Sequence, residues 1–305
     1  MEIPPVLALT LEKAVGAVVT NAASVGGGRS ATARLDTDAG SFFAKWATGP
    51  NAQTFMPEAE GLRALAARAD ELRIPAPVAA APSDGDDPGF LITPWIDSTA
   101  PTEAHARTLG QGLAMLHRVP DEEVQGEIRN GDPRYGFPDD NFIGEMPQQN
   151  TWHDTWPAFF RACRLEPQAA WARERGLWRA AWDAPFTQLL EGLPTLLPAT
   201  PPPSLVHGDL WGGNVLMTGA RGAALIDPAV YHGHREVDLA MTELFGRFSP
   251  QFYAAYDDAW PSEQGYATRR PVYNLYHLLN HLNIFGSGYA QSVDEAIRAA
   301  AKPLA

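Results

Sequence analysis

The stretch that decides the fold is His207-Gly208-Asp209-Leu210-Trp211-Gly212-Gly213-Asn214, and Ile226-Asp227-Pro228 follows it, with Asp227 13 residues beyond Asn214. The octapeptide has the form His-x-Asp-x4-Asn. Its carboxylate can accept a proton, and its amide, together with the carboxylate of Asp227, offers the oxygen ligands that Mg²⁺ prefers. The spacing therefore predicts that one base and two metal ligands meet in one cleft.

This pattern is that of the catalytic loop of kinases, in which the aspartate orients the attacking hydroxyl and the asparagine binds a metal ion. We expect Asp209 to be the catalytic residue, with Asn214 and Asp227 as ligands of Mg²⁺ bound with ATP. His207 is expected to be a structural hydrogen-bonding residue of the loop. Asp238 is expected to cap a helix that begins at Leu239 and to brace the loop.

The upstream half of a nucleotide site is also present. Residues 31–35 and 41–45 predict a β-hairpin, and Lys45 at its end stands where kinases place the lysine that binds the α- and β-phosphates. Glu58, on a helix predicted over 57–72, is expected to hold this lysine, with Glu60 as the competing candidate. In the loop over 26–30, the backbone N–H groups of Gly27 and Gly28 are expected to cover phosphate oxygens.

Lysine is scarce in this chain of 305 residues. Of 23 basic residues only three are lysines, and Lys45 is the one that lies far from both chain ends. The net charge of −13 argues against binding to nucleic acid or to an anionic membrane surface, since both rely on basic patches. The acidic balance favours a small-molecule partner whose phosphates arrive together with Mg²⁺.

Other sequence features bound the class of protein. The single cysteine, Cys163, excludes an intramolecular disulfide framework and a thiolate zinc site. The N-terminus does not have the form of a signal peptide, and no apolar run is long enough to span a membrane. We therefore expect a cytoplasmic protein, and we expect a monomer. His277 and His281, one helical turn apart, are expected to be packed or capping histidines rather than metal ligands.

The distribution of predicted strands and helices divides the chain. Residues 1–97 are rich in predicted strands and residues 98–305 are mostly helical, with a hinge near 94–98. We expect an α+β, two-lobed protein-kinase-like fold. The smaller N-terminal lobe would cover the nucleotide, and the larger lobe would carry the catalytic loop, the metal ligands and the acceptor site.

The sequence resembles the fructosamine kinase (ketosamine-3-kinase) family, within the wider protein-kinase-like and aminoglycoside-phosphotransferase-like group. The match is carried by 207–214, narrower than the general kinase loop, and by further segments at 109–117, 135–137, 141–144, 148–152, 226–241 and 244–246. The resemblance implies ATP-dependent phosphorylation of the sugar 3-hydroxyl of a ketosamine. The product is then expected to shed its sugar, so that the activity repairs glycated amines.

The resemblance also suggests contacts for the nucleotide and the acceptor. Backbone groups of Trp95 and Ile96 are expected to meet the adenine, although Pro94 stands where members of the group often carry Glu. The residues expected to contact the acceptor, a ketosamine or other glycated amine, are Asn150, Trp152, Trp211 and His234.

The class of acceptor stays open between a ketosamine and another amino-alcohol or amino-sugar, as in aminoglycoside or choline kinases. Asp227 and Asp238 are only 11 residues apart, and no Asp-Phe-Gly or Ala-Pro-Glu pair is present. That leaves little room for the long activation segment on which protein kinases dock peptides. A small or protruding acceptor is favoured, and the complete set of catalytic residues argues against a non-catalytic binding protein.

Overall fold

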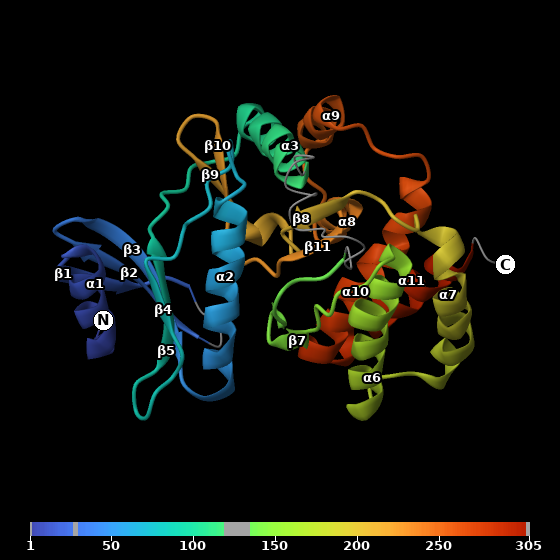
Figure 1. Ribbon diagram of the computed structural model, residues 1–305, viewed down its shortest axis with the longest axis horizontal. Helices are drawn as coiled ribbons and strands as arrows, with labels where there is room; N and C mark the ends of the chain where they lie inside the picture. Colours follow the sequence, from blue (N-terminus) through green and yellow to red (C-terminus); the bar gives the residue numbers. More distant parts are fainter. Residues whose placement is uncertain (1, 27–29, 119–134, 303–305) are drawn as a thin grey trace.

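The computed structural model describes residues 2–26, 30–118 and 135–302 of the chain. Figure 1 shows a sheet with helices α1 and α2 at one end and a larger, mainly helical body at the other. The expected two-lobed α+β fold is confirmed. The boundary at residue 97 remains a prediction, and it lies just beyond the last residue of the sheet, Pro94.

The N-terminal lobe is built on one antiparallel sheet with the strand order β1-β2-β3-β5-β4. The strands are β1 (Val19–Ser24), β2 (Ala31–Thr37), β3 (Gly40–Ala47), β4 (Ala79–Ala81) and β5 (Gly89–Pro94). β2 and β3 form the hairpin that the sequence predicts, joined at Thr37 and Gly40. β3 also pairs with β5, with Lys45 opposite Leu91.

The two faces of β3 have different roles because successive side chains of a strand point to opposite sides. Phe42, Ala44 and Trp46 are buried in a core that includes Leu7 and Leu11 of α1 (Pro5–Val15). Lys45 lies on the other face. Its position in the cleft thus follows from the alternation that buries its neighbours.

Helix α2 (Phe55–Ala66) follows the 3₁₀ turn η1 (Gly49–Thr54) and ends earlier than the sequence predicts. The helical spacing extends to residue 72, but Arg73 pairs with the C-terminal lobe. Its N–H donates to Ala223 O at 2.9 Å, and its carbonyl accepts from Leu225 N at 3.1 Å. Because this pairing needs extended backbone, the chain has left the helix before it reaches Arg73.

In its described residues, the C-terminal lobe contains helices, three short strand pairs and the catalytic loop. Its helices are α3 (Glu103–His117), α5 (Trp156–Phe160), α6 (Glu166–Glu174), α7 (Asp183–Leu196), α8 (Glu236–Leu244), α9 (Pro250–Ala259), α10 (Tyr266–Phe285) and α11 (Ala290–Ala301), with a π-helical turn at Arg161–Leu165. Its strand pairs are β6 (Asn141–Ile143) with β7 (Met146–Gln148), β8 (Pro203–Val206) with β11 (Tyr231–His234), and β9 (Val215–Thr218) with β10 (Gly222–Leu225).

The starts of α3 and α8 show how the chain begins these two helices. Thr102 caps α3 and forms a capping box with His105 in the position where Glu or Gln is usual. α8 begins at Glu236 rather than at Leu239, so Asp238 belongs to its first turn and is not its cap. The side chain of Asp238 is free to act elsewhere.

One hydrophobic core joins the two lobes. It contains Phe55 and Leu62 of α2, Leu91 of β5, and Leu109 and Leu113 of α3. Because α2 shares a core with the C-terminal lobe, the helix that carries Glu58 is held in place from both sides of the cleft.

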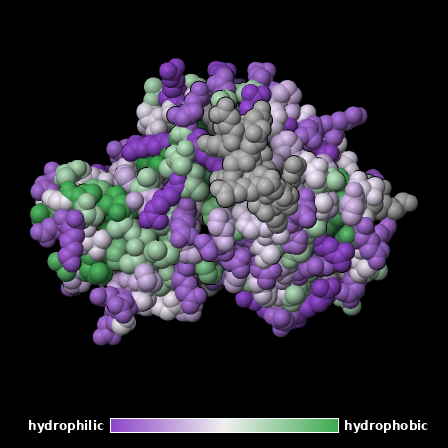
Figure 2. All heavy atoms as spheres, viewed as in Figure 1, coloured by the Kyte–Doolittle hydropathy of each residue, from purple (hydrophilic) through white to green (hydrophobic). Residues whose placement is uncertain are grey.

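Apolar side chains gather on the surface at the α1 end of the molecule (Figure 2). Leu9, Val15 and Val18 are exposed in this region. Among the described residues, no helix is both long and apolar enough to cross a membrane.

Candidate active site

The catalytic loop leaves β8 after Val206 and is fixed from behind by Asp238. The Asp238 carboxylate accepts hydrogen bonds from the backbone N–H of His207 at 2.7 Å and of Gly208 at 2.9 Å. It also contacts His117 Nε2 at 3.1 Å. Burial alone would raise the pKa of Asp238, but the hydrogen bonds and charges of its partners hold it below the usual value. The sequence prediction that Asp238 braces the loop agrees with these contacts.

Two residues in the loop region, Gly208 and Asp227, have a backbone conformation with positive φ. Gly208 has φ = 81°, and a Cβ atom there would lie 2.0 Å from Ala229 O, so only glycine fits. Asp227 has φ = 52° and is the one residue other than glycine with positive φ in the described part of the chain. Such a conformation costs free energy and persists where the surroundings impose it, often at functional sites.

His207 acts as a structural residue, as the sequence suggests. Its Nε2 contacts Ile226 O at 2.9 Å, and its Nδ1 accepts from the Asp209 N–H at 3.3 Å. Burial lowers the pKa of its imidazole. His207 thus connects the catalytic loop to the residue before Asp227.

Asp209 and Asn214 face each other across the turn of the loop. Asn214 Nδ2 donates to Asp209 O at 2.8 Å and to Asp209 Oδ2 at 3.2 Å. Burial raises the pKa of Asp209 to about 7, although the hydrogen bond from Asn214 opposes this shift. A carboxylate with such a pKa can take a proton near neutral pH.

Lys45, Glu58 and Asp227 form an ion-pair cluster across the cleft. Lys45 Nζ lies 2.5 Å from Glu58 Oε2 and 2.8 Å from Asp227 Oδ1. Burial opposes the charge of Lys45, but the two carboxylates offset this and raise its pKa. The charge of Lys45 in turn lowers the pKa of Asp227, whereas burial raises that of Glu58. Glu60, the competing candidate, is exposed and takes no part in this cluster.

A cavity of about 490 Å³ joins these groups. Its walls include Lys45, Glu58, Asp209, Asn214 and Asp227, so the structure brings together every catalytic and metal-ligand candidate of the sequence. Gly26 and Ser30, at the two ends of the glycine loop, also line it. Gly27 and Gly28, the predicted phosphate-binding glycines, lie outside the described residues.

A second cavity of about 230 Å³ adjoins the first and shares Val25, Glu58 and Asp227 with it. Trp95 and Ile96 line this cavity. The N–H of Trp95 donates to Ser41 O at 2.9 Å, so the sheet already uses this amide. Of the two predicted hinge residues, Ile96 is therefore the better placed to offer its backbone N–H to a ligand.

The four predicted acceptor contacts have different surroundings. Trp211 is 40% exposed and lines the larger cavity. Trp152 is 37% exposed, but it stacks on His232 and does not line that cavity. Asn150 is 1% exposed, donates to Asp139 O, and accepts from Arg164.

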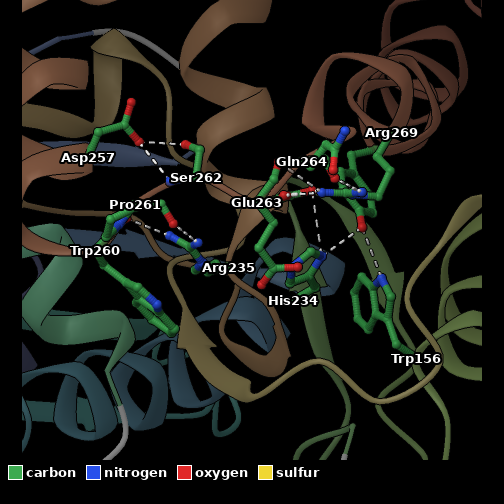
Figure 3. Close-up of polar contacts among 12 residues, drawn as sticks. Trp156, His234, Arg235, Asp257, Trp260, Pro261, Ser262, Glu263, Gln264 and Arg269 are labelled. Atoms are coloured by element: carbon green, nitrogen blue, oxygen red, sulfur yellow. Dashed lines mark hydrogen bonds and ion pairs between the residues drawn. The ribbon is translucent and has the colours of Figure 1, made fainter.

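His234 is also buried, at 1% exposure. Figure 3 shows it within a network of polar residues rather than at a surface: its Nδ1 contacts Tyr273 Oη at 2.8 Å, and Tyr273 also accepts from Trp156. Tyr231 and His234 lie three residues apart on β11 and so point to opposite faces, and both are buried, which means that both faces of this short strand are covered. Neither Asn150 nor His234 lines the larger cavity, and their contact with the acceptor stays a prediction.

Two further histidine clusters do not make a metal site. His234, Glu236 and Glu263 have ligand atoms within 4.8 Å of one another. Arg269, however, donates to both carboxylate oxygens of Glu236, at 2.7 and 2.6 Å, and so occupies the groups that a cation would need. His277 is buried, and His281 Nδ1 contacts its carbonyl, which agrees with the packed or capping role expected for the pair.

The sequence reasoning missed the hairpin turn between β6 and β7 as part of the site. Phe142, Gly144 and Glu145 line the larger cavity, opposite Asn51 and Thr54 of the N-terminal lobe. The segment 141–144 contributes to the family resemblance, but no local pattern indicates that its turn folds back to the catalytic loop.

Comparisons with known proteins agree with this geometry. A family model described as fructosamine kinase matches residues 6–302. A probable ketoamine kinase of Synechocystis is 39% identical over 259 residues, which cover 84% of this chain and 82% of the relative. The chloroplastic protein-ribulosamine 3-kinase of Arabidopsis thaliana is 36% identical and covers 92% of this chain, with 83% of its own length matched.

Solved structures show the same architecture. A candidate fructosamine-3-kinase of Thermobifida fusca superposes with a TM-score of 0.83 at 30% identity, over 97% of this chain and 98% of the other. A thermostable aminoglycoside phosphotransferase variant bound to AMP-PNP and hygromycin B has a TM-score of 0.61 over 97% and 99% of the two chains. At 15% identity the second likeness shows the fold alone.

Proposed function

Because the chain belongs to the fructosamine kinase family, we propose that it transfers the γ-phosphoryl group of ATP to the 3-hydroxyl of ketosamines, such as fructosyl and ribulosyl amines. The observation that carries this proposal is the single cavity in which Asp209, Asn214 and Asp227 face the Lys45–Glu58 pair. The phosphorylated ketosamine would then release its sugar, which frees the amine.

Asp209 is the residue that orients the acceptor hydroxyl and takes its proton. It lies in the cavity, and its raised pKa favours proton uptake at neutral pH. Phosphoryl transfer has a loose transition state in most analyses, so positioning and charge neutralisation supply most of the catalysis. Asn214 holds Asp209 in place through the hydrogen bond from its amide nitrogen.

Lys45 is the residue that binds the α- and β-phosphates. Glu58 and Asp227 keep it protonated and hold its ammonium group at the junction of the two cavities. The smaller cavity fits the adenine, with Ile96 at its hinge side. The acidic surroundings suit a nucleotide whose phosphates arrive partly neutralised by a divalent cation.

The residues present fit Mg²⁺. Asn214 uses its amide nitrogen on Asp209, which leaves Oδ1 as its metal-binding atom, and Asp227 presents an exposed carboxylate, of which one oxygen contacts Lys45. Both are hard oxygen donors, which Mg²⁺ prefers. When bound, Mg²⁺ would neutralise the charge that develops on the transferred phosphoryl group.

The decisive experiment measures ADP release in the presence of Mg²⁺ with fructosyl-lysine, ribulosyl-lysine, an aminoglycoside and choline. We expect ADP release to be stimulated by the two ketosamines, and ³¹P NMR to locate the phosphate on the 3-oxygen. Stimulation by the aminoglycoside or choline alone would contradict the proposal. No observation favours these alternatives, since the likeness to an aminoglycoside phosphotransferase is one of fold.

We also propose that the protein acts as a monomer in the cytoplasm. The site residues all come from one chain, and none of the cavity walls requires a second copy. Light scattering of the purified protein at micromolar concentration should give a mass near 33.1 kDa. A mass near twice that value would contradict the monomer.

A further inference from the structure

We infer that Gln148 is a positioning residue for Asp227 and thereby sets the affinity of the site for the divalent cation that accompanies ATP. The inference rests on the proposed function, in which Asp227 is a ligand of that cation. Gln148 is the last residue of β7, is 1% exposed, and lines neither cavity of the site. It therefore acts on the metal ligand through the backbone that it holds.

The backbone of Asp227 is the reason why such a residue is needed. Its φ of 52° lies in the left-handed region, which is unfavourable for a residue with a Cβ atom. Such a conformation persists where the surrounding structure imposes it. In this conformation the carboxylate lines the larger cavity and contacts Lys45 Nζ at 2.8 Å. Contacts to the neighbouring residues must therefore hold the chain in place.

The catalytic loop provides two of these contacts. The N–H of Ile226, just before Asp227, donates to Asn214 O at 3.1 Å. The N–H of Ala229, two residues after Asp227, donates to His207 O at 2.8 Å. The loop thus fixes the chain on both sides of the metal ligand, and in each case it uses an N–H group of the segment.

The β6–β7 hairpin holds the same segment by its carbonyl groups. Gln148 Nε2 donates to Ala229 O at 3.0 Å, and Asn141 Nδ2 donates to Val230 O at 2.7 Å. Ala229 and Val230 are buried, so a carbonyl that lost its donor there would stay unsatisfied or would have to turn. The peptide groups that follow Asp227 are therefore held between the loop and the hairpin.

The amide of Gln148 is itself held in one orientation. Its Nε2 also donates to Asn141 Oδ1 at 2.7 Å, and the hydroxyl of Tyr276 on α10 donates to its Oε1 at 2.6 Å. Asn141 and Gln148 are also directly paired across the two strands. Because the oxygen of the amide faces Tyr276, its nitrogen is directed at Ala229. A buried network with every member bonded has a single low-energy arrangement.

A packing role does not explain an amide at this position. An apolar side chain of the same length, such as Met, could fill the space, and burying an amide is unfavourable unless its polar atoms are bonded. What the amide of Gln148 adds is the bond to the segment that carries Asp227. Residues that orient a metal ligand from behind commonly change metal affinity when they are replaced.

The test measures the binding of Mn²⁺, as a paramagnetic substitute for Mg²⁺, to the complex of the enzyme with ADP by electron paramagnetic resonance. Gln148→Met keeps the length of the side chain and removes the donor to Ala229. We expect the Kd for Mn²⁺ to rise roughly tenfold. The Kd for ADP without metal should stay unchanged, because Gln148 does not line the smaller cavity.

A matched control separates this effect from a loss of stability. Asn283 is also a buried amide that donates to a backbone carbonyl, Gln168 O at 2.9 Å, and it lines neither cavity. Asn283→Leu should lower the unfolding temperature, as Gln148→Met does, and should leave the Kd for Mn²⁺ unchanged. An equal rise of this Kd in both variants would overturn the inference, since lower stability alone would then explain it.

A second variant keeps the test decisive if Gln148→Met does not fold. Asn141→Ser removes the donor to Val230 O, and because Asn141 borders the larger cavity, water can fill the space that the change leaves. We expect the Kd for Mn²⁺ to rise in this variant too, by a smaller factor. An unchanged Kd in the folded variants would overturn the inference.

The outcomes distinguish this inference from the proposed function. If wild type phosphorylates ketosamines but Gln148→Met binds Mn²⁺ as tightly as wild type, the role of Gln148 is overturned and the proposed function stands. If wild type phosphorylates no ketosamine but Gln148→Met weakens Mn²⁺ binding as expected, the proposed acceptor falls and the role of Gln148 stands. If the complex of wild type with ADP binds no Mn²⁺, the metal site and the inference fall together.

Discussion

At the scale of single residues, the site depends on a few charged side chains whose surroundings change their proton affinities. Burial raises the pKa of Asp209 to about 7, while Lys45 lowers that of Asp227. Two carboxylates of the same motif region therefore differ in chemistry: Asp209 can accept a proton near neutral pH, whereas Lys45 favours the anionic form of Asp227. This difference follows from which of them contacts the lysine.

The role of Asp209 leads to a direct prediction. Asp209→Asn keeps the shape of the side chain but removes the proton acceptor, and we expect kcat to fall by roughly 10²–10⁴. The variant should still bind ATP, which can be measured by calorimetry. Wild-type turnover in the variant would exclude Asp209 as the base.

The scarcity of lysine offers a matched pair of variants. Lys45→Ala leaves Glu58 and Asp227 facing each other without a cation and removes the phosphate ligand, so we expect kcat/KM for ATP to fall by roughly 10²–10³. Lys13→Ala, at an exposed position on α1, serves as the control and should have no effect. Equal activities of the two variants would rule out the phosphate-binding role of Lys45.

At the scale of elements, the site is positioned by contacts between distant segments. The first turn of α8 supplies Asp238 to the catalytic loop, and α3 supplies His117 to Asp238. α2 presents Glu58 to β3, and the anchored β6–β7 hairpin closes the cavity opposite them. Each of these elements is a short segment of the chain, and the cavity is formed by side chains from several of them together.

The bracing of the loop by α8 can be tested with Asp238→Ala. The change leaves the N–H groups of His207 and Gly208 and the ring of His117 without their buried acceptor. We expect the free energy of unfolding to drop by about 3 kcal/mol and kcat to fall as the loop loses its position. Asp86→Ala, on an exposed turn, is the control for denaturant unfolding and activity. A loss no larger than that of the control would show that the loop holds its position without this brace.

At the scale of elements the sequence predicts the β2–β3 hairpin well, because turn residues act through neighbours in the chain. It places the ends of α2 and the start of α8 less well. Arg73, just beyond the predicted helix, pairs with β10 in extended backbone, and Glu236 at the start of α8 forms an ion pair with Arg269 of α10. Both boundaries are set by partners far away in sequence.

At the scale of the whole molecule, two lobes share a core through α2, and the C-terminal lobe encloses several neutral histidines. Burial lowers the pKa of His277 to about 3 and that of His232 to about 4. Between the folded and the ordinary pKa values, His277 and His232 stay unprotonated in the folded protein, while the same side chains bind a proton in the unfolded chain. Stability is therefore fully present above the ordinary pKa of these histidines and is lost as pH falls.

This linkage predicts an acid-sensitive fold. Below pH 6.5, the ordinary pKa of His277, the free energy of unfolding should fall by about 1.4 kcal/mol per pH unit. This fall should continue until the pH reaches the pKa of His277 in the folded protein. Urea unfolding of wild type and His277→Gln at pH 7 and pH 5 measures the effect, with a shallower pH dependence expected for the variant. Identical slopes in the two proteins would contradict this role of His277.

The sequence by itself predicted a catalytic set whose members the structure brings to one cavity. Short spacings around a tight loop predict Asp209, Asn214 and Asp227, and places on a hairpin and the next helix predict Lys45 and Glu58, so local patterns were sufficient to propose these residues. The resemblance to the family was also sufficient to predict two lobes.

Only the tertiary structure decided which of the remaining polar and aromatic residues reach the cavity. It buried Asn150 and His234 behind Arg164 and Tyr273, and it brought Glu145 into the wall. The reason is physical: a strand of four residues or a two-residue turn carries no periodicity that identifies its inner face. That face is chosen by hydrogen bonds to segments such as Ala229–Val230, which lie far along the chain.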